Sequence, residues 1–178
     1  MVILRKILPL LGAVLWLGML PLRAQDEETP EQKQYREDFE LYQKIAAIPA
    51  ASKRAEGWLQ FLQDRPKSQI VAKVQYDYLL VVQDWFKQSK WEIVVPQMER
   101  FLKLRPKAGE GYYFLGAALK EQKKLPEAMN ALAKCYVLRC PASQKARQFL
   151  EVIYKGANKG STAGLDALIE KARKEVGG

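Results

Sequence analysis

The chain has 178 residues, 48% of them hydrophobic and 28% charged, and it carries a formal net charge of +9. It contains no histidine, which excludes catalytic triads and metal sites built on that residue. The length is enough for one domain with a hydrophobic core in addition to a short targeting segment.

Residues 1–24 have the composition of a secretory signal peptide. Two basic residues near the start precede an apolar run that ends at Leu22, and Ala24 is followed by the polar sequence QDEETPEQ. We expect cleavage after Ala24 and a mature chain that is periplasmic or secreted. The alternative is that the segment is retained and anchors the protein in the inner membrane. The apolar run is, however, shorter than the roughly 20 residues of a spanning helix.

Residues 25–34 are an N-terminal segment that leads into the repetitive part of the chain. From residue 35 onward the apolar residues recur at steps of three and four, as in amphipathic helices. No stretch alternates with the period of two that a strand requires. The pattern predicts an all-α protein of about eight helices. Their approximate limits are 29–47, 52–64, 68–85, 89–105, 112–119, 124–138, 143–157 and 161–176.

Capping signals predict where several of these helices begin. Thr29 and Gln32 have the spacing of a capping box, and Ser89 with Glu92 repeats that spacing before the fourth helix. Ser161 or Thr162 is expected to cap the last helix, after the loop GANKGST. That loop lacks the Gly-Lys-Ser/Thr order of a phosphate-binding loop and is interpreted as a helix connection.

Prolines predict where helices end. Pro66 and Pro106 each follow an arginine, and the residue before a proline is driven out of the helical conformation. Pro96 falls inside the fourth helix, where we expect a kink.

One phrase occurs twice in the chain and a third time in a looser form. FLQDRPKS covers 61–68, FLKLRPKA covers 101–108, and CYVLRCPAS covers 135–143. Repetition over 30 to 40 residues is typical of stacked helical units rather than of a catalytic domain.

Residues 109–142 resemble a tetratricopeptide repeat, a unit of 34 residues with two antiparallel helices. The matching positions are Tyr112, Leu115, Gly116, Leu119, Ala128, Leu132 and Cys135. The resemblance implies that Gly116 and Ala128 lie where the two helices cross closely. Residues 35–68 and 75–108 resemble the same unit with departures, and residues 143–178 are expected to form a capping helix pair. The fold implied is a right-handed α-solenoid of antiparallel helix pairs.

The resemblance also implies a groove along the inner side, lined by the first helix of each pair. Its expected residues are Phe39, Gln43, Leu79, Gln83, Phe86, Tyr113, Ala117, Lys120, Arg147 and Tyr154. The Lys and Asn residues that clamp a peptide carboxylate in some members of the family are absent. The expected function is therefore that of an exported, non-enzymatic adaptor that binds an apolar peptide or helix of a cell-envelope protein. The alternative is that curvature or the N-terminal helix buries this surface.

The charge is unevenly spread along the chain. Residues 25–99 carry 10 Lys and Arg against 13 Asp and Glu, whereas residues 100–178 carry 16 against 7. A basic C-terminal half suits anionic surroundings, which leaves open a second hypothesis of a membrane-anchored tether that contacts anionic lipid. Nucleic acid is not expected as a partner, because no recognition motif accompanies the charge.

Cys135 and Cys140 are the two cysteines of the chain. Residues five apart in a continuous helix diverge too far for a disulfide, but a helix that ends near Arg139 lets Cys140 fold back. The sequence leaves both a disulfide and two unpaired thiols open. No metal site and no cofactor are expected.

Overall fold

The computed structural model describes residues 28–177, and the expected signal segment over 1–24 lies outside them. The described residues form eight helices and no strand, which confirms the predicted all-α class. The helices are α1 (Pro30–Ala46), α2 (Ala51–Asp64), α3 (Val71–Lys87), α4 (Trp91–Leu104), α5 (Gly109–Glu121), α6 (Leu125–Val137), α7 (Ser143–Ala157) and α8 (Leu165–Gly177). No helix in this part of the chain is long and apolar enough to cross a membrane.

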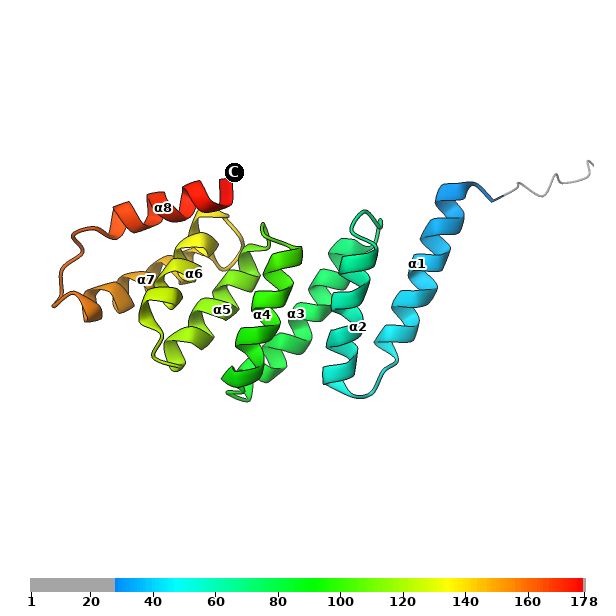
Figure 1. Cartoon of the computed structure of the whole chain (residues 1–178), viewed down its shortest axis with the longest axis horizontal. Helices are drawn as coiled ribbons and strands as arrows, with labels where there is room; N and C mark the ends of the chain where they lie inside the picture. Colours follow the sequence, from blue (N-terminus) through cyan, green and yellow to red (C-terminus); the bar gives the residue numbers. More distant parts are fainter. Residues whose placement is uncertain (1–27, 178) are drawn as a thin grey trace, which may run out of the picture.

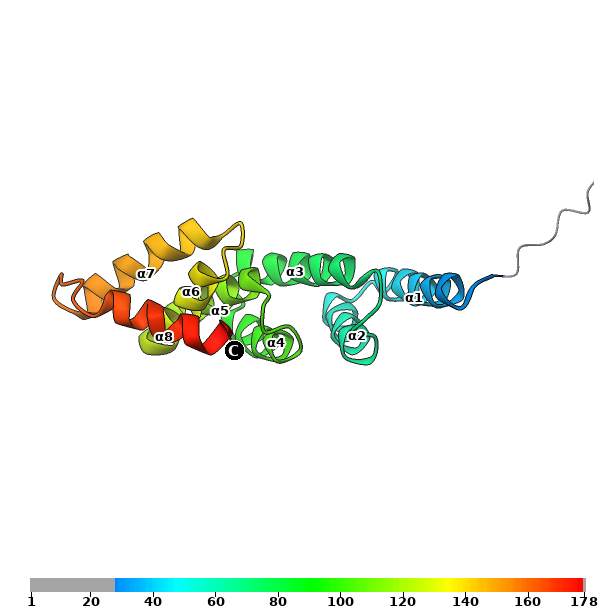
Figure 2. The same cartoon turned by 90° about the horizontal axis from the view of Figure 1, so that it is seen from above.

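From α1 to α7, successive helices pack against each other along the long axis of the molecule (Figure 1). Seen from above, α1 and α3 lie in one row and α2 and α4 in the other (Figure 2). This packing between neighbours is consistent with a helical repeat. At the far end the chain turns back, so that α8 packs on α6 instead of extending the rows.

The repeated phrase folds into the same turn twice. Arg65 and Arg105 end α2 and α4 with φ/ψ of −128°/53° and −134°/67°. Each arginine donates its backbone N–H to the carbonyl of a buried phenylalanine, Phe61 or Phe101, at 2.9 Å. The proline that follows each arginine excludes the helical conformation at that position, as the sequence predicted.

The third version of the phrase folds differently, because its proline comes one residue later. Helix α6 ends at Val137, and Arg139 takes the left-handed conformation with φ of 53°. A left-handed residue after a helix reverses the direction of the chain. Cys140 is thereby turned back toward the end of α6.

The close crossing expected at Gly116 is confirmed. A Cβ atom at this position would lie 2.7 Å from Cγ of Leu132 and 3.0 Å from the carbonyl oxygen of Ala128. Ala128 is itself fully buried. Small residues on α5 and α6 therefore let the two backbones approach, and Leu132 fills the space beside them.

The capping box at Thr29 is confirmed, but the one expected at Ser89 is wrong. The Thr29 hydroxyl accepts from the N–H of Gln32 at 3.2 Å, and the Gln32 side chain accepts from the N–H of Thr29 at 2.8 Å. Ser89 instead has φ of 57° and belongs to the end of α3. Its N–H donates to the carbonyl of Phe86, and the N–H of Lys90 donates to that of Trp85, both at 3.0 Å. This is the hydrogen-bond pattern that closes a helix C-terminus.

Two other expected starts are displaced. Helix α3 begins at Val71 rather than Ser68, whose carbonyl accepts from the N–H of Val71 at 3.2 Å. Helix α8 begins at Leu165, and the Ser161 hydroxyl accepts from the N–H of Ala163 within the preceding loop. Helix α4 runs continuously through Pro96.

Candidate functional site

A groove lies between α3, α5 and the turn that leads from α6 into α7. It consists of two hollows, one of about 300 Å³ beside Leu79 and one of about 340 Å³ beside Phe86 and Tyr113. Glu110 and Pro141 line both hollows, which therefore adjoin. We call the combined surface the α3–α5 groove.

Helix α3 supplies most of one wall. Ala72, Tyr76, Leu79, Gln83 and Phe86 follow each other at steps of three or four residues and line the two hollows. This spacing places them on one face of the helix. Tyr76 is 62% exposed, which is unusual for an aromatic side chain of this size.

The aromatic side chains of the groove are held by their neighbours. The ring of Phe86 packs edge-on against Trp91 and Phe114, with centroid distances of 4.9 Å and 5.4 Å. The ring of Tyr113 lies 6.0 Å from that of Phe114. Each of these side chains is only partly buried, so the cluster is fixed in place and still presents apolar surface.

The charged residues of the groove are arranged unevenly. Glu110, in the first turn of α5, lies where the two hollows meet, and Lys87 and Lys145 line only the larger hollow. A carboxylate in the first turn of a helix is favoured by the helix dipole. The groove thus has a basic end, a central acid and an apolar end.

Four of the residues predicted for the groove line it in the structure. They are Leu79, Gln83, Phe86 and Tyr113. All belong to the two central helices, α3 and α5.

The predicted residues of α1 lie elsewhere. Phe39 stacks between the rings of Tyr35 and Tyr42, with centroid distances of 6.1 Å and 5.7 Å, and Gln43 is exposed. Neither residue lines the α3–α5 groove. The row of rings on α1 continues to Trp58 of α2 and joins α1 to the rest of the molecule.

The remaining predictions on α5 are also displaced from the groove. Ala117 is only 4% exposed, so it offers no accessible surface to a partner. Lys120 pairs with Glu121 at 2.8 Å, and its ammonium group lies 6.0 Å from the ring centre of Phe149 on α7.

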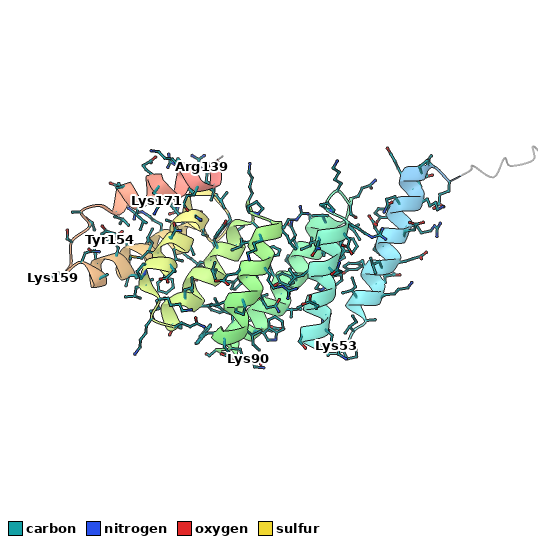
Figure 3. All side chains as sticks on the ribbon, viewed as in Figure 1. Lys53, Lys90, Arg139, Tyr154, Lys159 and Lys171 are labelled. Atoms are coloured by element: carbon teal, nitrogen blue, oxygen red, sulfur yellow. The ribbon has the colours of Figure 1, made fainter. Side chains whose placement is uncertain are left out.

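The predicted residues of α7 have structural contacts instead. The guanidinium group of Arg147 lies 5.7 Å from the ring centre of Tyr136, on the α6 side of the helix. The hydroxyl of Tyr154 donates to the carbonyl of Ala163 at 2.6 Å and so fastens the α7–α8 loop, at the end of the molecule seen in Figure 3.

Several groove residues were not predicted from the sequence. Tyr76 and Glu110 lie one helical turn before Leu79 and Tyr113, so extending the predicted stripes by a turn would have found them. Pro141 in the α6–α7 turn and Lys145 in the first turn of α7 also line the groove. The sequence pattern around Pro141 and Lys145 does not indicate that these residues line the groove.

Cys135 and Cys140 are unpaired thiols in the structure, and their Sγ atoms are 3.2 Å apart. The reversal at Arg139 brings them together, as expected for a helix that ends near that residue. Among the described residues, no group of three or more His, Cys, Asp or Glu side chains is placed to hold a metal ion. No family model, curated protein or solved structure matches the chain.

Proposed function

We propose that the protein is a non-enzymatic adaptor of the tetratricopeptide type, and that its α3–α5 groove binds an apolar segment or helix of a protein partner. The signal-like sequence at residues 1–24 supports a partner in the cell envelope. The observation that carries the proposal is the groove itself, which combines two adjoining hollows with aromatic and aliphatic side chains on rigid helices.

The size and lining of the groove suit spaced apolar anchors. Leu79 faces one hollow, and Phe86 and Tyr113 face the other. Burying one large apolar side chain in such a hollow contributes about 1.5–3 kcal/mol, so two anchors together contribute about 3–6 kcal/mol to the free energy of binding. Gln83 and Gln75 line the hollows and offer hydrogen bonds to the backbone of the ligand.

The charges of the groove define the direction of the ligand. Lys87 and Lys145 favour an acidic residue at the end that lies over the larger hollow. Glu110 disfavours an acidic residue between the two anchors. The preferred ligand is therefore a segment with two large apolar residues and an acid beyond one of them.

A peptide-display selection tests the proposal. Peptides selected on the purified chain should carry two apolar anchors and a flanking acid. Their affinity should fall about 10- to 100-fold on Tyr113→Ala, which corresponds to the loss of one anchor contact. Val152→Ala is the matched control, because Val152 is 69% exposed on α7 and does not line the groove.

Two outcomes of the selection would contradict the proposal. A selection that enriches no peptide, or peptides that bind Tyr113→Ala as tightly as the unaltered chain, would show that the groove is not the binding surface. Helix content measured on each variant separates a loss of binding from a loss of folding.

A further inference from the structure

The two cysteines form a close pair at the junction of α6 with the α6–α7 turn. Their Sγ atoms are 3.2 Å apart, and Sγ of Cys140 lies 4.0 Å from the carbonyl oxygen of Cys135. A disulfide bond of about 2.0 Å needs the sulfur atoms to come closer by little more than 1 Å, which is within the reach of side-chain rotation.

The two thiols differ in their access to solvent. Cys135 is fully buried in the core formed by α6, α7 and α8. Cys140 is partly exposed and lines the smaller hollow of the α3–α5 groove, beside Ala108 and Glu110. A reagent in the groove therefore meets Cys140 first, and Cys135 lies directly behind it.

The structure also makes room for Cys140 at this position. A Cβ atom on Gly109 would lie 2.8 Å from Cβ of Cys140 and 3.2 Å from its Sγ. Any larger residue at 109 would push Cys140 away from α5. Gly109 thus permits the contact between the first turn of α5 and the turn that carries the exposed thiol.

We propose that Cys140 and Cys135 are a thiol–disulfide exchange site, in which Cys140 attacks an organic disulfide in the groove and Cys135 then resolves the mixed disulfide. This inference does not depend on the adaptor function, because it concerns the reactivity of the chain's own thiols.

The exchange takes place in two steps. The Cys140 thiol loses its proton to solvent, and its sulfur attacks one sulfur of the reagent, whose S–S bond breaks and releases one thiolate. The Cys135 thiol then loses its proton and attacks Sγ of Cys140, and the second thiolate leaves. Each released thiolate takes up a proton. The two cysteines are oxidised by two electrons together, and the reagent is reduced to two thiols.

The surroundings of Cys135 slow the second step, in which this thiol resolves the mixed disulfide. Burial raises the pKa of the Cys135 thiol, and the neighbouring Cys140 and the carboxylate of Glu110 raise it further. The thiolate is the reacting form, so resolution should become faster as the pH increases. Glu110→Gln removes one negative charge from the site and should accelerate resolution at a fixed pH.

Oxidised glutathione is a suitable probe of the exchange. The reduced chain is treated with it, the reaction is stopped with acid, and the intact mass is measured. At the end of the reaction the unaltered chain should have lost the mass of two hydrogen atoms and should carry no glutathione. Cys135→Ala should retain one glutathione on Cys140. Cys140→Ala should not react in the folded state, but should react at Cys135 once it is denatured.

Three results would overturn the inference. They are glutathione still bound to the unaltered chain at the end of the reaction, no reaction of the unaltered chain, and a reaction of folded Cys140→Ala as fast as that of Cys135→Ala. Cys135→Ala can disturb the packing of this buried position. Cys135→Ser is therefore a second variant that lacks the resolving thiol. Helix content identifies any variant that has not folded.

Discussion

Asp38 is the one charged side chain in the described residues that is almost completely buried, with 1% of its surface exposed. It pairs with Arg65 of the repeated phrase and accepts a hydrogen bond from Gln34 at 2.7 Å. Burial alone would raise the pKa of the Asp38 carboxyl. Hydrogen bonds from Ser68, Arg65 and Gln34 outweigh this effect, and the pKa is lowered. The carboxylate thus joins α1 to the α2–α3 turn.

The lowered pKa of Asp38 determines how the free energy of unfolding changes with pH. The unfolded chain binds the proton more tightly, so this contribution to stability is present above about pH 4 and is lost as the pH falls through the folded pKa. Asp38→Ala should lower the free energy of unfolding by about 3 kcal/mol near neutral pH. Denaturant titrations should show the difference between the variant and the unaltered chain shrinking in acid.

An exposed ion pair provides the control for Asp38. Glu56 pairs with Arg100 at 2.6 Å, but both side chains are about half exposed, at 54% and 48%. Glu56→Ala should change the free energy of unfolding by at most about 1 kcal/mol. If Asp38→Ala and Glu56→Ala lower the free energy of unfolding equally, the burial of Asp38 does not account for the contribution of its ion pair.

Gly116 gives a second prediction at the scale of single residues. Alanine is the better helix former by about 1 kcal/mol, so Gly116→Ala would stabilise an isolated helix. In the folded protein the new methyl group would lie 2.7 Å from Cγ of Leu132, and forcing an extra carbon into such a contact costs about 1–3 kcal/mol. Chemical denaturation should therefore show a net loss of stability.

Gly156 is the matched position for this test. It lies in the last turn of α7, and a Cβ atom there would meet nothing within 4 Å. Gly156→Ala should raise the free energy of unfolding, by up to about 1 kcal/mol. If both substitutions change the free energy of unfolding in the same direction, the close crossing of α5 and α6 is contradicted.

At the scale of elements, the end of α6 gives a prediction that concerns oxidation. A disulfide between Cys135 and Cys140 would close a loop of only six residues, worth roughly 2 kcal/mol in the chain-entropy model. Oxidation should raise the melting temperature by only a few degrees and leave the far-UV helical signal unchanged. Loss of helical signal on reduction would show that the bond is needed for the fold.

Helix ends show how far local sequence rules reach in this protein. Pro66 and Pro106 set the ends of α2 and α4 through the conformation of the residue before each proline, which is a strictly local effect. The start of α4 was misassigned to Ser89, which instead takes a left-handed conformation after α3, where glycine is the usual signal. Lys123 does the same after α5, with φ of 62°. Backbone hydrogen bonds to the preceding helix close both turns, and neither turn contains the glycine that would have indicated a left-handed residue.

At the scale of the whole molecule, the groove also shows where prediction from local sequence patterns stops. Leu79, Gln83 and Phe86 on α3 and Tyr113 on α5 line the groove as predicted, because these helices are flanked on both sides and their groove faces follow from helical spacing. Ala117 on α5 was misplaced because it is buried. Arg147 of α7 faces Tyr136, and Phe39 of α1 stacks within its own helix. Which face α1 or α7 presents to the groove depends on how the helix crosses its neighbours, and the residue pattern of a single helix does not specify this.

The charges at one end of the groove predict the kinetics of binding. Lys145→Glu should slow the association of an acid-ended peptide at low salt, with a smaller effect as salt screens the charge. Stopped-flow association measured over a range of ionic strengths tests this. Lys120→Glu is the control, because Lys120 lies against Phe149 and outside the groove. If both variants slow association equally, the effect comes from net charge and not from the position of Lys145.

Site-specific photo-crosslinking in intact cells tests the binding groove most directly. A crosslinking residue replaces Tyr76, which is exposed in the groove, or Val152, which is exposed outside it. We predict a discrete protein adduct from position 76 that is lost when Tyr113→Ala is added, and no such adduct from position 152. The same adducts from both positions, or an adduct from position 76 that survives Tyr113→Ala, would contradict the groove as the partner-binding surface.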